Sequence, residues 1–121
     1  MSFWSRLLLF LSGLMGAAGV ALSAYAAHAE GGANLTTAAT FLMIHAAAVA
    51  GVCAGDVTRR GLLQAASLLV LGAALFSGDI AMRAVNGATL WRMAAPTGGV
   101  MLIVGWLWLA VAAWAGRRPA P

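Results

Sequence analysis

Four long apolar stretches, separated by short polar joints, make up almost the whole chain. They cover roughly Arg6–Tyr25, Ala38–Gly55, Leu62–Met82 and Ala94–Trp114. Each is close to the ~20 residues with which an α-helix crosses a ~30 Å hydrocarbon core. The pattern predicts an all-α polytopic membrane protein: a four-helix transmembrane bundle that forms a single domain over residues 1–121. With their flanks, the predicted spans are about 6–28, 37–56, 61–83 and 94–115.

The joints carry ordinary signals for ending and starting helices. Residues 30–34 form a flexible turn, and Thr36 or Thr37 could then cap the second helix. Residues 56–61 predict a tight hairpin that makes the second and third spans antiparallel neighbours. Pro96 is expected in the first turn of the last span, where its missing N–H is not needed.

Composition excludes a soluble protein. The chain is 63% hydrophobic and only 8% charged, with a mean hydropathy of +0.93, whereas soluble domains carry about 25% charged residues. A net charge of +4 would suggest nucleic-acid binding in a soluble protein. Here the basic residues sit at helix ends, which indicates topology and headgroup anchors, so we expect no nucleic-acid partner. Cys53 is the single cysteine and forms no internal disulfide.

The arginines predict an orientation. Two of the seven, Arg83 and Arg92, fall on one side of the membrane together with Glu30. Cytoplasmic joints carry the excess of positive charge. Both termini are therefore expected in the cytoplasm, or in the matrix if the membrane is mitochondrial. The five arginines on that side are Arg6, Arg59, Arg60, Arg117 and Arg118.

The first apolar stretch also has features of a secretory signal peptide. Arg6 would be its basic region, Leu7–Leu22 its apolar region and Ala27–Ala29 its cleavage site. The apolar stretch is longer than that of a usual signal peptide, so we interpret it as a retained transmembrane helix.

Small residues recur at every fourth position. In membranes such stripes allow helix backbones to approach closely. The main expectation is close packing within the bundle, and a subunit interface is the alternative. The stripes are Gly13, Ala17 and Ala21; Gly19, Ser23 and Ala27; Ala47, Gly51 and Gly55; and Ala73, Ser77 and Ala81.

Few polar residues fall at membrane depth, and they are the candidate site residues. His45 lies near the middle of the second span, where a neutral imidazole bonded to a carbonyl or hydroxyl of a neighbouring helix is expected. Proton relay, quinone contact and metal ligation are alternatives. His28 lies at the end of the first span, at a different depth from His45, which disfavours a bis-histidine haem. No metal motif, cysteine pair or paired carboxylate is present, so we predict no cofactor and no enzyme.

Asp79 and Arg83 are four residues apart, on one face of the third span. We expect them to neutralise each other near the external interface, with a carboxylate lining an external cavity as the alternative. The candidate polar cluster in the membrane is therefore His28, His45, Ser77, Asp79 and Arg83.

Several segments resemble a known family of small membrane proteins. They are Ser23–Ala29, Phe41–Ala46, Leu75–Gly78, and Pro96–Gly99 with Gly105 and Trp106. In order along all four spans, they are similar to the YgdD-type proteins, domain-of-unknown-function family 423. Asp79 and Ala26 depart from that pattern. The resemblance implies a four-helix fold in a bacterial inner membrane, or in a mitochondrial inner membrane in a eukaryote. It implies no activity.

The leading functional hypothesis is a non-enzymatic accessory or scaffold subunit. It would pack against a larger membrane complex, a respiratory complex being one candidate. A second hypothesis is an oligomeric transporter or channel with a path lined by His45, Ser77 and Asp79. A third is a lipid or quinone pocket lined by Phe76, Trp106 and Trp108 with His45 as its polar contact. The expected partners are the lipid bilayer and either a larger complex or further copies of the chain.

Overall fold

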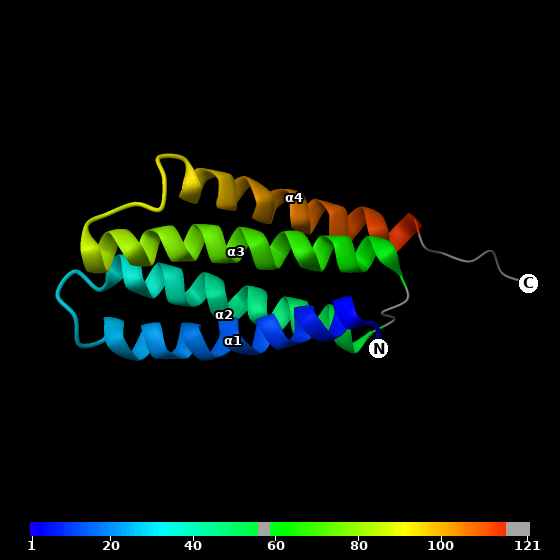
Figure 1. Cartoon of the computed structure of the whole chain (residues 1–121), viewed down its shortest axis with the longest axis horizontal. Coiled ribbons are helices and arrows are strands. Elements are labelled where there is room, and N and C mark those ends of the chain that lie inside the picture. Colours follow the sequence, from blue (N-terminus) through cyan, green and yellow to red (C-terminus); the bar gives the residue numbers. More distant parts are fainter. Residues whose placement is uncertain (56–58, 116–121) are drawn as a thin grey trace, which may run out of the picture.

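The computed structural model of the protein describes residues 1–55 and 59–115. It contains four α-helices: α1 (Phe3–Ala26), α2 (Ala33–Ala54), α3 (Arg60–Asn86) and α4 (Ala94–Ala115). They lie side by side in an up-and-down arrangement, and no strand occurs in the described ranges (Figure 1). All four are long and apolar enough to cross a membrane. The predicted fold class, an all-α four-helix transmembrane bundle, is confirmed.

The helices pack in the order of the chain. α1 packs on α2, α2 on α3 and α3 on α4, and α1 also reaches α3. Helix α1 begins and α4 ends at one end of the bundle, which we call the proximal end (Figure 1). The joints 27–32 and 87–93 lie at the distal end. Half of the hairpin predicted between α2 and α3, residues 56–58, lies outside the described residues.

The helix ends differ from the sequence prediction at two joints. Helix α2 begins at Ala33, with Gly32 at the N-cap and no side-chain cap, so the predicted threonine cap is wrong. The hydroxyls of Thr36 and Thr37 instead donate to carbonyls one turn back, at 3.0 and 3.2 Å. Helix α3 runs on to Asn86 and ends at Gly87, whose φ of +69° is the left-handed conformation that closes many helices.

Helices α3 and α4 are in backbone contact at Gly98. A Cβ atom added at Gly98 would lie 2.5 Å from the backbone N of Phe76 and 2.8 Å from the carbonyl O of Gly72. Only a residue without a side chain fits there. Since lipid gives helices no hydrophobic drive to associate, such backbone contact provides the dispersion energy that holds them together.

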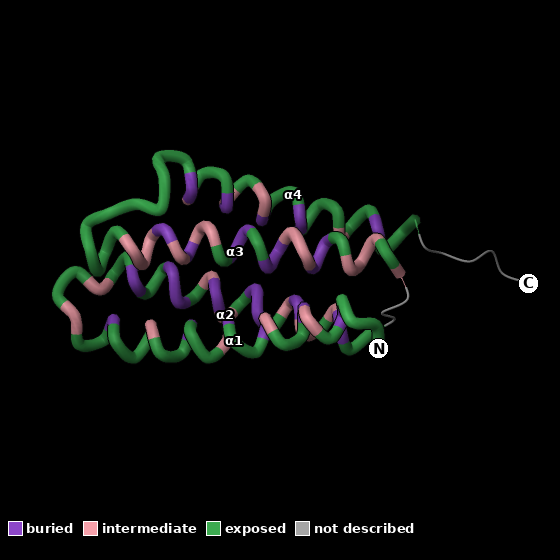
Figure 2. Tube along the Cα trace, in the orientation of Figure 1, coloured by how far each residue is buried: buried purple, intermediate pink, exposed green. Residues whose placement is uncertain are grey.

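Buried and exposed residues alternate along each helix (Figure 2), and the small-residue stripes differ in their burial. In α3, Ala73 and Ser77 are fully buried, as expected for packing within the bundle. The stripes that begin at Gly13 in α1 and at Ala47 in α2 are exposed throughout. For these two stripes the expected packing inside the bundle is wrong, because α3 packs on the other side of the α1–α2 hairpin. In the stripe from Gly19, only Gly19 is buried.

Candidate functional site

Both ring nitrogens of His45 are hydrogen-bonded, one within α2 and the other to α4. Its Nδ1 lies 2.6 Å from the carbonyl O of Phe41, and its Nε2 lies 3.1 Å from Nε1 of Trp106. A carbonyl can only accept and an indole N–H can only donate. His45 is therefore neutral, with its proton on Nδ1, and Nε2 accepts from Trp106. The sequence predicted a neutral imidazole, but the carbonyl belongs to its own helix rather than to a neighbouring one.

Aromatic rings surround this pair. Phe41 stacks on the His45 ring at a centroid distance of 5.7 Å, and Phe76 of α3 lies 4.6 Å from Phe41. These side chains line a groove of about 490 Å³, which we call the histidine groove. Its volume is within the range of small-molecule sites. The residues lining it are Phe41, Ile44, His45, Phe76, Gly99, Leu102, Ile103 and Trp106.

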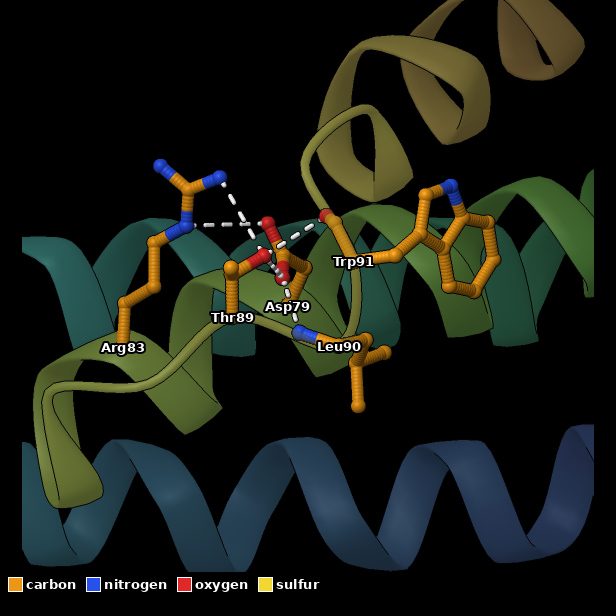
Figure 3. A network of polar contacts seen from close by, with 5 residues as sticks. All are labelled: Asp79, Arg83, Thr89, Leu90 and Trp91. Atoms are coloured by element: carbon orange, nitrogen blue, oxygen red, sulfur yellow. Dashed lines mark hydrogen bonds and ion pairs between the residues drawn. The ribbon is translucent and has the colours of Figure 1, made fainter.

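Asp79 is fully buried in α3 and binds the joint that leads to α4 (Figure 3). Its Oδ1 accepts from the hydroxyl of Thr89 at 2.5 Å and from the backbone N–H of Leu90 at 2.8 Å. Thr89 Oγ1 also lies 2.7 Å from the carbonyl O of Trp91. A hydroxyl has one proton, and the charged carboxylate is the stronger acceptor. Asp79 therefore holds the α3–α4 joint against the end of the bundle.

Arg83 supplies the countercharge for Asp79. Its Nε lies 3.1 Å from Asp79 Oδ2, and half of its side chain is exposed. The structure thus contains the ion pair that the spacing of four residues suggested. The structure also shows a second partner of the carboxylate: Oδ2 faces Arg83, and Oδ1 accepts from the joint. The alternative of a carboxylate that faces an external cavity is not supported by this geometry.

The two arginines of the distal end line a second groove. It has a volume of about 600 Å³, and we call it the arginine groove. Arg92 is exposed and has no hydrogen bond or ion pair with any described residue. The lining residues are Phe76, Arg83, Arg92, Ala95, Pro96, Gly99, Val100 and Ile103.

The remaining candidates lie apart from these grooves. His28 is exposed in the joint after α1, whereas His45 is twelve residues into α2, about 18 Å along the helix. Ser77 is buried, and its Oγ has no partner among the described residues. Trp108 donates to Gln64 Oε1 at 3.2 Å, beside a separate groove of about 690 Å³ near the proximal end. The structure therefore brings together His45, Phe76 and Trp106, but neither His28 nor Trp108.

Sequence reasoning missed two residues. Thr89 holds the carboxylate of Asp79, but it stands ten residues away in a joint, where no helical spacing connects the two. Arg92 was interpreted only as an anchor. Its signal was present, because the arginine count predicts that Arg92 lies on the external side, where positive charge is less frequent, and it has no acidic neighbour within helical reach.

The described residues contain no group of three or more histidine, cysteine, aspartate or glutamate side chains that could hold a metal ion. The fold and these grooves define the class: a small four-span membrane protein whose central histidine and distal aspartate connect its helices.

Comparison with known proteins places the chain in a family. The model described as "Protein of unknown function (DUF423)" matches residues 8–99, and the chain belongs to this family. It is 29% identical over 118 residues to the UPF0382 inner membrane protein YgdD of Escherichia coli K12, with 90% of each chain covered. The YgdD proteins of Escherichia coli O157:H7 and Shigella flexneri match equally. The resemblance in the sequence is thus confirmed. No solved structure matches the chain.

Proposed function

We propose that the protein is a non-enzymatic accessory or scaffold subunit of a larger membrane complex. The observation that carries this proposal is a stripe of small residues on the exposed side of the α1–α2 hairpin, where a partner helix can approach closely. We call Gly13, Ala17, Ala47 and Gly51 the small-residue face.

Helix geometry puts these four residues on one side of the hairpin. Gly16 faces Ala46, because a Cβ at Gly16 would lie 3.7 Å from that of Ala46. One residue onward, each helix turns by about 100°, and in antiparallel helices Ala17 and Ala47 then point to the same side. One residue back, Met15 and His45 point to the opposite side, where both are buried. The small-residue face is therefore the side away from α3.

This face has room for another helix. A Cβ added at Gly13 or at Gly51 would meet nothing within 4 Å. Membrane helices associate where small residues let their backbones come close. The occupant we propose is a transmembrane helix of a larger protein. The face contributes no charged residue that would line a path for ions, which favours a partner helix over a pore between copies.

The transport alternative has less support. The side chains assigned to its path do not line a common cavity. His45 is bonded to Trp106, and Asp79 is bonded to Arg83 and to the joint. Ser77 is enclosed between helices.

Purification from native membranes in a mild detergent tests the accessory role. We expect the protein to migrate with a larger protein at a fixed stoichiometry. Gly51→Leu should release it as a small species, because the new side chain fills the proposed contact. Gly99→Leu, on the α4 side, is the matched control and should leave the complex intact. A homo-oligomer would favour transport instead, and a monomer at native expression would contradict the proposal.

The relatives are inner membrane proteins by name. We propose that this chain lies in a bacterial inner membrane, with both termini and the proximal end in the cytoplasm. Reporters fused after Pro121 should read as cytoplasmic and one inserted at Gly31 as external. A C-terminal reporter that reads as external would overturn this orientation.

The histidine groove supports a second candidate function, the binding of the apolar chain of a lipid or quinone. Three residues predicted for such a pocket, His45, Phe76 and Trp106, line this one groove. Mass spectrometry of the purified protein should detect a retained lipid or quinone. Gly99→Leu should remove it by filling the groove, whereas Gly13→Leu should not. Equal retention by all three proteins would contradict this function.

A further inference from the structure

The histidine groove and the arginine groove are adjacent along α4. Both are lined by Phe76, Gly99 and Ile103. One apolar surface therefore leads from the two arginines at the distal end to the histidine–tryptophan pair inside the bundle.

The length of this surface matches one leaflet of a bilayer. From Pro96 to Trp106, α4 rises by about 15 Å. The hydrocarbon core is about 30 Å thick, so each leaflet contributes about 15 Å. A chain that follows the groove from its mouth would end close to His45.

Charge distinguishes the two ends of the groove. At its mouth, Asp79 is occupied by Arg83 and by the joint, and Glu30 stands in the other distal joint. Arg92 has no acidic partner among the described residues. Half of the Arg83 side chain remains exposed. The mouth thus carries positive charge that the described residues leave unbalanced. In the proposed orientation the mouth lies on the external side, where positive charge is less frequent.

We propose that this continuous groove binds an anionic phospholipid of the leaflet at the distal end. Its phosphate lies between Arg83 and Arg92, and one of its acyl chains lies along Phe76, Gly99 and Ile103 toward Trp106. Guanidinium groups present several N–H donors to phosphate oxygens. The proposal rests on the chain-binding function of the histidine groove and adds the class of its ligand: a phosphate diester lipid with net negative charge, as opposed to a neutral quinone.

Native mass spectrometry of the full chain with two lipids tests the proposal. Phosphatidylglycerol and phosphatidylcholine with identical acyl chains serve as probes, each titrated against the detergent-solubilised protein. We expect tighter binding of phosphatidylglycerol by at least fivefold, which is the effect of about one arginine near a membrane surface. Arg92→Gln should weaken binding of phosphatidylglycerol more than that of phosphatidylcholine, and so remove that preference. Arg6→Gln, at the proximal end, is the matched control and should keep the preference.

The variants separate the two ways in which this account can fail. If both lipids bind equally, and Gly99→Leu abolishes both, the groove binds chains but the proposed headgroup site is wrong. If neither lipid binds, or if Gly99→Leu has no effect, the chain-binding function itself is wrong. Displacement of phosphatidylglycerol by millimolar inorganic phosphate alone would show that the arginines form a site for free phosphate and would contradict a lipid site.

Discussion

Helices α2 and α4 have the same length of 22 residues, yet they differ in the side chains that they expose. Helix α2 exposes one large hydrophobic side chain, Ile44, whereas α4 exposes eight. Helix α2 packs between α1 and α3, whereas α4 packs mainly on α3 and reaches α2 through the contact of Trp106 with His45. The eight in α4 are Val100, Ile103, Val104, Trp106, Leu107, Trp108, Val111 and Trp114.

This difference distinguishes a surface suited to lipid from one suited to protein. Large, branched and aromatic side chains fill the uneven space between lipid chains and helices. Small residues gain little from lipid, but they allow a partner helix to approach closely. The α3–α4 side also carries the buried aspartate, the two distal arginines and the tryptophan that donates to His45. We therefore propose a protein partner for the small-residue face of the α1–α2 hairpin, and lipid contact for α3–α4.

The largest loss of stability is expected when Asp79 is removed. Asp79→Ala should lower the free energy of unfolding by about 2–3 kcal/mol, because it leaves the Leu90 N–H and the Thr89 hydroxyl without their acceptor. Titration with a denaturing detergent measures this loss. Asp79→Asn keeps one acceptor oxygen and should cost less. Unchanged stability in both variants would mean that the joint is held by other contacts.

Gly98→Ala tests the backbone contact on the α3–α4 side. The added methyl group would collide with backbone atoms of α3, and we expect a loss of about 1–3 kcal/mol. Gly13→Ala, on the small-residue face, is the matched control. It should leave the stability equal or raise it by up to ~1 kcal/mol, since alanine is the better helix former. Equal losses in the two variants would remove the distinction between a closed side and an open one.

His45→Ala should lower the stability by about 1–2 kcal/mol, the range for hydrogen bonds between membrane helices. His45→Gln should cost less, because its amide oxygen can still accept from Trp106. In a double-mutant cycle with Trp106→Phe, we expect a coupling near 0.6 kcal/mol or above. A melting temperature that does not change while a growth phenotype is lost would identify His45 as a functional residue.

The smallest effect is expected at Arg83. Half of its side chain is exposed, so water screens its attraction for Asp79. The coupling between Arg83→Ala and Asp79→Ala should be about 0.5–1 kcal/mol and should fall as salt is added. A coupling that salt does not alter would show that the pair is shielded from water.

The pattern of the sequence was sufficient for the fold because each span must satisfy its backbone within one helix. The period of apolar residues and the polar joints locate such helices, as they did for all four. The pattern could not predict which face of each helix is buried in the bundle. Gly13 and Ala73 begin similar stripes of small residues, yet one stripe is exposed and the other buried, and only the order of packing decides between them.

The same limit applies to the candidate site. The spacing of Asp79 and Arg83 predicted their ion pair, since helical neighbours are a local property. His45 and Trp106 are 61 residues apart in sequence and lie on different helices. The contact of Asp79 with Thr89 depends on the path of a joint. Both arise from tertiary structure, and no helical period encodes them.

Photo-crosslinking in native membranes compares the two surfaces most directly. A crosslinking amino acid at Ala47 should give one discrete protein adduct, and the same residue at Val104 on α4 should give lipid adducts. Gly51→Leu should remove the Ala47 adduct, and Gly99→Leu should leave it. Protein adducts from Val104 but none from Ala47, or an Ala47 adduct that Gly51→Leu does not change, would contradict the assignment of the small-residue face to a protein partner.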